Sequence, residues 1–224
     1  WMGGHGTGIG GIVVDSGTFD WSDDKFRLYN EPDGSYHNLR YAHDLGDLTP
    51  VAFILRMRLV PLRNLGACIS PDNAWMFLQG IETLPLRMRE HCKNGLETAT
   101  FLRQHDHVNW VRYPGLENDP SYQKAQSQFE NGFGSMIVFG LNGGRKEGET
   151  FINNLELFSH LANVGDAKSL AIHPSSTTHS QLTDQELADA GVTEDMIRLS
   201  IGIEDIEDIK NDIDQALKKA SIAG

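Results

Sequence analysis

The sequence predicts an α/β fold, because strand-forming runs alternate with helical patterns along the second half of the chain. Residues 136–141 form a short buried apolar run that ends at a glycine pair, which is typical of a core strand. Residues 205–220 place isoleucine and leucine at helical spacing, which predicts an amphipathic helix. The expected order is strand 108–111, helix 122–129, strand 136–141, helix 147–161, strand 169–172, a helix from Thr183, a strand around Arg198 and helix 205–220.

The first half of the chain is less regular. Residues 10–14 are expected to form a short buried strand that leads into a turn, and residues 19–47 a long surface excursion. Ser70-Pro71 resembles a helix cap followed by proline at the first helical position. Residues 71–105 therefore predict a long connecting helix, which Pro85 should kink.

Composition excludes several classes of protein. The chain has 224 residues and a formal net charge of -12 without a basic stripe, which argues against a nucleic-acid partner. No apolar run has the length of a membrane-spanning helix, so no membrane partner is expected. Cys68 and Cys92 lack metal-binding or disulfide spacing and are expected to be buried, which points to a reducing cytoplasm.

Arg198 is the strongest candidate for a binding residue. It stands within an apolar, strand-forming run, 196–204, where a cation needs a partner. The rigid fork of arginine suits a carboxylate held by two contacts, and the hydroxyl-rich segment 175–180 offers further donors. A structural ion pair with one of the many carboxylates of the chain is the alternative.

Two other motifs carry weaker signals. Residues 6–11 match GxGxxG, but the dinucleotide fingerprint requires a strand before it and a helix after it. A flexible glycine loop is the better interpretation. His105 and His107 are two potential metal ligands without a third, so no metal site is expected.

Four stretches together resemble the pyridoxal-phosphate enzymes of cysteine and methionine metabolism, and the resemblance covers nearly the whole chain. The stretches are Trp1 to Gly17, Leu65 to Pro71 with Gln79 to Arg87, Asn163 to Ser180, and Ile197 to Glu204. The subgroup they resemble most is O-acetylhomoserine sulfhydrylase, also called aminocarboxypropyltransferase.

The resemblance implies the C-terminal part of a fold-type I enzyme. Residues 1–70 would end the large cofactor-binding domain, 71–105 would form the connecting helix, and 106–224 the small C-terminal α/β domain. The implied cofactor is pyridoxal 5'-phosphate. In the family the lysine that carries it stands immediately before the segment that opens this chain at Trp1. The catalytic lysine is therefore expected to lie outside this chain, which would be inactive without the N-terminal half.

The resemblance also assigns roles to residues that this chain does contain. Arg198 would bind the α-carboxylate of the substrate, Asn163 would assist it, and Thr178 would line the site. Gly3, Gly4 and Gly6 would form the loop close to the cofactor. Ser169 is expected to be structural rather than catalytic.

The implied activity is replacement of the acetate of O-acetylhomoserine by sulfide or methanethiol, which gives homocysteine or methionine. The implied partners are that amino acid, a sulfur donor and identical subunits of a cytoplasmic homotetramer. The alternatives are a methionine γ-lyase, a cystathionine γ-synthase or γ-lyase, and a non-catalytic fragment.

Overall fold

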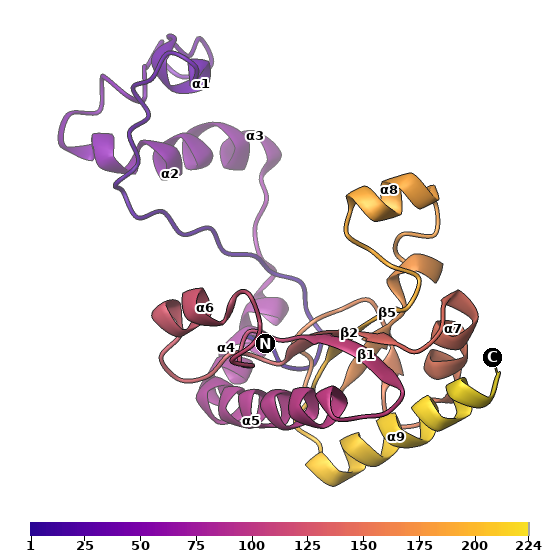
Figure 1. Ribbon diagram of the computed structural model, residues 1–224. Helices are drawn as coiled ribbons and strands as arrows, with labels where there is room; N and C mark the ends of the chain where they lie inside the picture. Colours follow the sequence, from indigo (N-terminus) through magenta and orange to yellow (C-terminus); the bar gives the residue numbers. More distant parts are fainter. Residues whose placement is uncertain (224) are drawn as a thin grey trace. The chain divides into compact units, whose positions relative to one another are not determined.

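The chain divides into two compact units, which are described separately. The computed structural model describes residues 1–223, the side chains of Asp184 and Ala223 excepted. The larger unit combines Trp1–Gly8 with Trp75–Gly224, and the smaller unit is Ile9–Ala74 (Figure 1). The predicted domain limits at residues 70 and 105 stay a prediction.

The larger unit is built on a five-stranded sheet with the order β1-β2-β5-β4-β3 (Figure 1). Neighbouring strands are antiparallel except for β3 and β4, which are parallel. The strands are β1 (Val108–Arg112), β2 (Met136–Leu141), β3 (Ser159–His160), β4 (Leu170–Ile172) and β5 (Met196–Ser200). The predicted α/β fold is confirmed, and β5, which carries Arg198, is the central strand.

The helices lie near the positions that the apolar pattern predicts, with two corrections. They are α4 (Pro71–Glu82), α5 (Leu84–Arg103), α6 (Tyr122–Gln128), α7 (Arg145–Asn154), α8 (Asp184–Asp189) and α9 (Ile206–Ala223). The prediction of a helix over 147–161 is wrong at its end, because α7 ends at Asn154 and residues 159–160 pair with β4 as strand β3. The prediction of one helix over 71–105 is wrong, because α4 ends before Thr83 and α5 begins at Leu84. Pro85 occupies the first turn of α5, where its missing N–H leaves no helical hydrogen bond unmade.

The core of the larger unit lies between the sheet and one face of α9. Ile209, Ile213 and Leu217 recur at helical spacing on α9 and are almost fully buried. On β5, Ile197 and Leu199 point into the same core and are 0% exposed, since alternate residues of a strand face the same side. Arg198 therefore points to the opposite face of the sheet.

The smaller unit has a core made mostly of aromatic rings. Trp21 stacks on Tyr29 with 4.3 Å between ring centroids and lies 5.5 Å from the ring of Phe53. Its helical segments are α1 (Arg27–Asn30), η1 (Gly46–Val51), α2 (Ala52–Met57), η2 (Arg58–Leu62) and α3 (Arg63–Leu65). Their core consists of Tyr29, Tyr41, Ala42 and Ala52.

The predicted buried strand at residues 10–14 is wrong. This segment joins no ladder among the described residues, and Ile12, Val13 and Val14 are exposed. A strand needs a neighbour for its backbone N–H and C=O groups, and β-branched residues alone do not supply one. The expected burial of both cysteines is also wrong for Cys68, which is exposed, whereas Cys92 is half-buried.

Candidate functional site

Arg198 is a half-buried cation without a carboxylate partner. Residues 1–223 contain no ion pair to its guanidinium. Its hydrogen bond is from Nη2 to the backbone carbonyl of Asn163, at 3.4 Å. Burial lowers the pKa of the Arg198 guanidinium from its ordinary value. A partly desolvated arginine whose fork lacks an acid is suited to an anionic ligand. The alternative of a structural ion pair is wrong for the described residues.

The loop that contains Asn163 is held against β5 and the residues after it by buried hydrogen bonds. The Gly165 N–H donates to Ser200 Oγ at 2.9 Å. Ser169 donates from its hydroxyl to the Glu204 carboxylate at 2.9 Å, and the same hydroxyl accepts the Gly202 N–H at 2.9 Å. Because these contacts are buried and mutually satisfied, Ser169 holds the loop in place, which agrees with the structural role expected from the sequence.

The glycine segment at the start of the chain packs against this same loop. The carbonyl of Gly4 accepts the Ala167 N–H at 2.7 Å. A Cβ at Gly6 would lie 3.2 Å from the Asp166 carboxylate and 3.6 Å from the Asn163 amide. Gly4 and Gly6 have φ values of 83° and 61°, a region that favours glycine. The segment can approach the loop closely because these side chains are absent.

Trp1 packs against the middle of the same loop, at Gly165. A Cβ on Gly165 would come within 2.5 Å of both the Trp1 ring and its backbone nitrogen, and Gly165 has a φ of 76°. The structure thus brings together residues that are about 160 positions apart in the sequence: the backbone of Trp1 to Gly6, the 163–167 loop and Arg198.

Thr178 is the predicted site residue that no described contact joins to Arg198. Its side chain is exposed, and its hydroxyl pairs with Nδ1 of the adjacent His179 at 2.8 Å. The side chain of Asn163 is also exposed, and its Oδ1 accepts the Val164 N–H at 2.9 Å. It is therefore the backbone carbonyl of Asn163 that touches Arg198, and the role of Thr178 stays a prediction.

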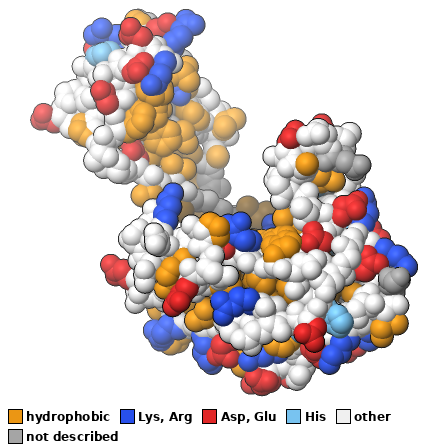
Figure 2. All heavy atoms as spheres, viewed as in Figure 1, with side chains coloured by type: hydrophobic (Ala, Val, Ile, Leu, Met, Phe, Trp, Pro, Cys, Tyr) orange, Lys and Arg blue, Asp and Glu red, His pale blue; other side chains and the backbone are white. Residues whose placement is uncertain are grey.

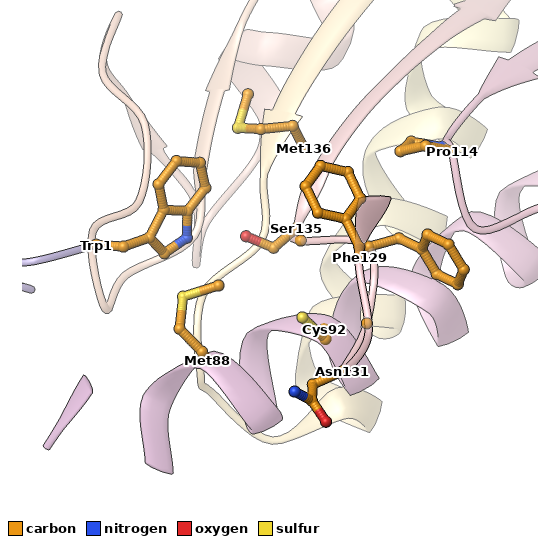
Figure 3. A pocket seen from close by; sticks show the side chains of 11 residues that line it. Trp1, Met88, Cys92, Pro114, Phe129, Asn131, Ser135 and Met136 are labelled. Atoms are coloured by element: carbon orange, nitrogen blue, oxygen red, sulfur yellow. The ribbon is translucent and has the colours of Figure 1, made fainter. Parts of the chain in front are cut away.

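An apolar cavity of about 490 Å³ lies next to Trp1 within the larger unit. Figure 3 shows Trp1, Met88, Cys92 and Met136 around it. None of the site residues predicted from the sequence lines this cavity, but Trp1, which packs on Gly165 of the 163–167 loop, forms part of its wall. Among the described residues, no group of three or more His, Cys, Asp or Glu side chains is arranged to hold a metal ion. No helix in residues 1–223 is long and apolar enough to cross a bilayer.

Reasoning from the sequence missed one buried cation, Arg87. Its side chain is 8% exposed and donates hydrogen bonds to the carbonyls of Trp1 and Met2. The available signal was an arginine near a helix start, four residues after Thr83 and two after Pro85, between the apolar residues Leu86 and Met88. That pattern does not indicate that the partner is a backbone segment more than 80 residues earlier.

The central strand, its unpaired arginine and the glycine segment thus form one arrangement in which a half-buried cation lies beside a closely packed backbone loop. The chain belongs to the family described as Cys/Met metabolism PLP-dependent enzyme, whose match covers residues 1–218.

Curated relatives agree with this assignment. The chain is 52% identical over 223 residues to the O-acetyl-L-homoserine sulfhydrylase of Leptospira meyeri, covering 97% of this chain and 50% of that protein. It is 46% identical to O-acetyl-L-homoserine sulfhydrylase 1 of Thermus thermophilus, over 97% of this chain and 51% of that protein. The chain thus spans about half the length of the curated relatives it matches.

A solved structure shows the same fold. It is named as an O-acetylhomoserine (thiol)-lyase of Campylobacter jejuni and holds N'-pyridoxyl-lysine-5'-monophosphate. It matches with a TM-score of 0.84 and 37% identity, over 97% of this chain and 51% of that one. The family that the sequence predicts is confirmed.

Proposed function

We propose that this chain is part of an O-acetylhomoserine sulfhydrylase, which replaces the acetate of O-acetyl-L-homoserine by sulfide or methanethiol. The observation that carries the proposal is Arg198, a half-buried cation without an acidic partner among the described side chains. It lies on the strand β5 and contacts the 163–167 loop, which in turn packs against the glycine segment. The relatives named above, at 46% and 52% identity, are sulfhydrylases, which supports the choice of reaction.

The residues present fit pyridoxal phosphate and its amino-acid substrate in two respects. Gly4 and Gly6 have positive φ, and a side chain on Gly4 would collide with its neighbours, so the backbone at these two positions, a few residues after the proposed cofactor lysine, carries no side chain. Arg198 supplies a cation for a planar carboxylate. When bound, pyridoxal phosphate supplies an electron sink for the carbanions that γ-replacement requires.

This chain contributes orientation to that reaction. Arg198 would hold the substrate carboxylate by two hydrogen bonds, which fixes the direction of the bonds at the α-carbon. The Asn163 carbonyl accepts one guanidinium N–H and thereby limits the rotation of the fork. The lysine that moves protons would stand immediately before Trp1, where the packing of Trp1 on Gly165 limits its position relative to Arg198.

The test is the Arg198→Ala variant of the full-length protein. Loss of the charge-assisted pair should cost about 1.5–3 kcal/mol of transition-state stabilisation, which lowers kcat/KM for O-acetylhomoserine roughly ten- to a hundredfold. Cofactor binding should be retained, because Arg198 acts on the substrate. Arg145→Ala is a matched control, since this exposed arginine of α7 pairs only with Glu149, at 3.3 Å. An unchanged kcat/KM in Arg198→Ala would contradict the proposal.

The choice of reaction is tested on the wild-type protein. Turnover of O-acetylhomoserine with sulfide to homocysteine supports the sulfhydrylase. Ammonia and a keto acid formed from methionine or cystathionine, without replacement by sulfide, would assign a lyase instead.

We also infer a cytoplasmic homotetramer. The smaller unit supports the inference that this protein self-associates, because its surface gathers apolar side chains (Figure 2). Ile9 is 88% exposed and Val14 is 82% exposed. Light scattering of the purified full-length protein measures the mass, and a monomer would contradict the inference.

A further inference from the structure

Arg87 is a buried arginine whose hydrogen-bond partners belong to three separate parts of the larger unit. Nη1 donates to the carbonyl of Trp1 at 2.6 Å, and Nη2 donates to the carbonyl of Met2 at 3.3 Å. Nη2 also donates to the carbonyl of Gly80 at 2.6 Å, near the end of α4. Nε donates to the hydroxyl of Thr83 at 3.2 Å, in the break between α4 and α5. The fork therefore ties the Trp1-Met2 backbone to the start of α5.

The partners of Arg87 are all neutral. No carboxylate that the structure describes forms an ion pair with it, although it is only 8% exposed. Burying a cation without an anion is unfavourable, and an apolar side chain of similar volume often stabilises a protein more. Stability of the fold is therefore a poor explanation for an arginine at this position, whereas fixing several carbonyls in one arrangement is a good one.

The backbone that Arg87 holds is also shaped to fit it. Gly4 has a φ of 83°, and a Cβ there would lie 2.8 Å from the Arg87 guanidinium carbon. A Cβ at Gly80 would collide with the carbonyl of Met2 and would lie 2.6 Å from that of Gly3. The two glycines leave room for the Trp1 to Gly4 backbone between α4 and the guanidinium.

The opposite side of the same backbone contacts the substrate-binding loop. Gly4 accepts the Ala167 N–H at 2.7 Å, and Trp1 packs on Gly165. That loop in turn touches Arg198 through Asn163. The Trp1 to Gly4 backbone is thus held by Arg87 on one side and by the Arg198 loop on the other.

We propose that Arg87 is a positioning residue of the active site: by holding the carbonyls of Trp1 and Met2, it sets where the preceding lysine presents its amine relative to Arg198. The inference rests on the proposed function, which puts the cofactor lysine immediately before Trp1. Arg87 touches neither cofactor nor substrate in this role. It acts by holding backbone carbonyls through several guanidinium N–H groups at once. A positive charge without this forked arrangement of donors, as in lysine, should therefore not position the backbone.

The experiment compares Arg87→Lys with Arg89→Lys in the full-length protein. Arg87→Lys keeps the positive charge and loses the fork, whereas Arg89 lies exposed on the same helix and serves as the matched control. Pyridoxal phosphate is titrated into the apoprotein while the visible absorbance of the lysine-bound cofactor is recorded. The kcat and the KM for O-acetylhomoserine are then measured on the loaded protein.

The expected result for Arg87→Lys is a Kd for pyridoxal phosphate raised by about tenfold or more, with a displaced or weakened absorbance band. The kcat should fall by a similar factor, because the amine is misplaced. The KM for O-acetylhomoserine should stay within about twofold, since Arg198 keeps its contacts. Arg89→Lys should match the wild type in every readout.

Several results would overturn the proposal. One is an Arg87→Lys protein that matches Arg89→Lys in cofactor Kd, absorbance band and kcat. Another is a fall in thermal stability with an unchanged band and kcat, which would show a structural role alone. If Arg87→Lys does not fold, Thr83→Val decides, because it removes the Nε partner of Arg87 and leaves the three carbonyl acceptors in place. The substitution also removes the hydrogen bond that the Thr83 hydroxyl donates to the Gly80 carbonyl at 3.4 Å. A raised Kd and a lowered kcat support the proposal, and wild-type values overturn it. A wild-type protein that binds no pyridoxal phosphate contradicts the proposed function itself.

Discussion

The two units of this chain solve the problem of backbone hydrogen bonding in different ways. The larger unit pairs its strands in a five-stranded sheet, whose buried face packs on α9. The smaller unit has one isolated bridge, between Asp33 and Leu39, in place of a sheet, and it combines short helices with aspartate side chains that accept a backbone N–H two residues further on. These bonds join Asp15 to Gly17, Asp20 to Ser22, Asp23 to Lys25 and Asp33 to Ser35. The strands and helices of the larger unit follow from periodic apolar residues, whereas many turns of the smaller unit follow from local aspartate hydrogen bonds.

The cores of the two units differ in how completely their aromatic rings are buried. Phe139 and Phe151 are 0% exposed within a continuous core of aliphatic and aromatic side chains, and their rings meet edge to face at 5.7 Å. In the smaller unit, Trp21 stacks on neighbouring rings but keeps some exposure. This difference implies that substitutions of similar size should cost unequal amounts in the two units.

The largest effect is expected for Phe139→Ala in the larger unit. Removing a fully buried ring leaves a cavity between β2 and α7, which should lower the free energy of unfolding by about 3–5 kcal/mol. Urea unfolding of the full-length protein measures it. Ile222→Ala is the control, because Ile222 is 85% exposed and its truncation should change the free energy of unfolding by less than about 0.5 kcal/mol. A loss for Phe139→Ala no larger than the loss for Trp21→Ala in the smaller unit would contradict the comparison of the two cores.

A smaller effect is expected for Trp21→Ala in the smaller unit. The variant loses the stacking on Tyr29 and Phe53 but uncovers a side chain that was already partly exposed, so we expect a loss of about 2 kcal/mol. Hydrogen exchange by mass spectrometry locates the loss. Exchange should accelerate within residues 9–74 and stay unchanged in β2 and β5. Accelerated exchange in those strands as well would show that the two units unfold together.

The third effect is confined to alkaline pH and concerns the buried Tyr41 of the smaller unit. Burial, followed by its hydrogen bond to Asp33 at 3.1 Å, raises the pKa of Tyr41 from 10.0 to about 12. The unfolded chain then loses this proton before the folded one does. The stability contributed by Tyr41 is therefore complete below pH 10 and is lost as the pH rises to about 12.

Urea unfolding at a series of pH values between 10 and 12 measures this loss, and Tyr41→Phe should reduce it. Tyr113→Phe gives the comparison in the larger unit, where burial raises the pKa of Tyr113 and its hydroxyl donates to the Gly134 carbonyl at 2.9 Å. If Tyr41→Phe follows the wild type throughout this range, the phenol of Tyr41 is not protected from ionisation.

The sequence predicted those features whose causes are local. Apolar runs of the right length located β2 and β5, and the repeat of Ile209, Ile213 and Leu217 located α9. Pro85 marked the interruption near Thr83, although the structure shows a break between two helices rather than a kink. The segment 10–14 failed because its β-branched residues find no paired strand.

The candidate site divides in the same way. Arg198 was identified because a cation within an apolar strand is conspicuous in any sequence. Arg87 was not, since its partners are backbone carbonyls, which every residue has and which leave no trace in the sequence. The exposed position of Thr178 and the contact of Arg198 with the Asn163 carbonyl rather than its amide were likewise invisible.

The sequence by itself determined the alternation of strands and helices after residue 106, the buried face of α9, and the presence of an unusual cation on the strand β5. These follow from periodicity and side-chain chemistry, which act over a few residues. Only the tertiary structure decided that Trp1 to Gly4 passes between Arg87 and the 163–167 loop, and that no carboxylate of residues 1–223 reaches Arg198. Contacts between such distant segments depend on how the whole chain packs, because their geometry is set by the sheet and helices together rather than by neighbouring residues.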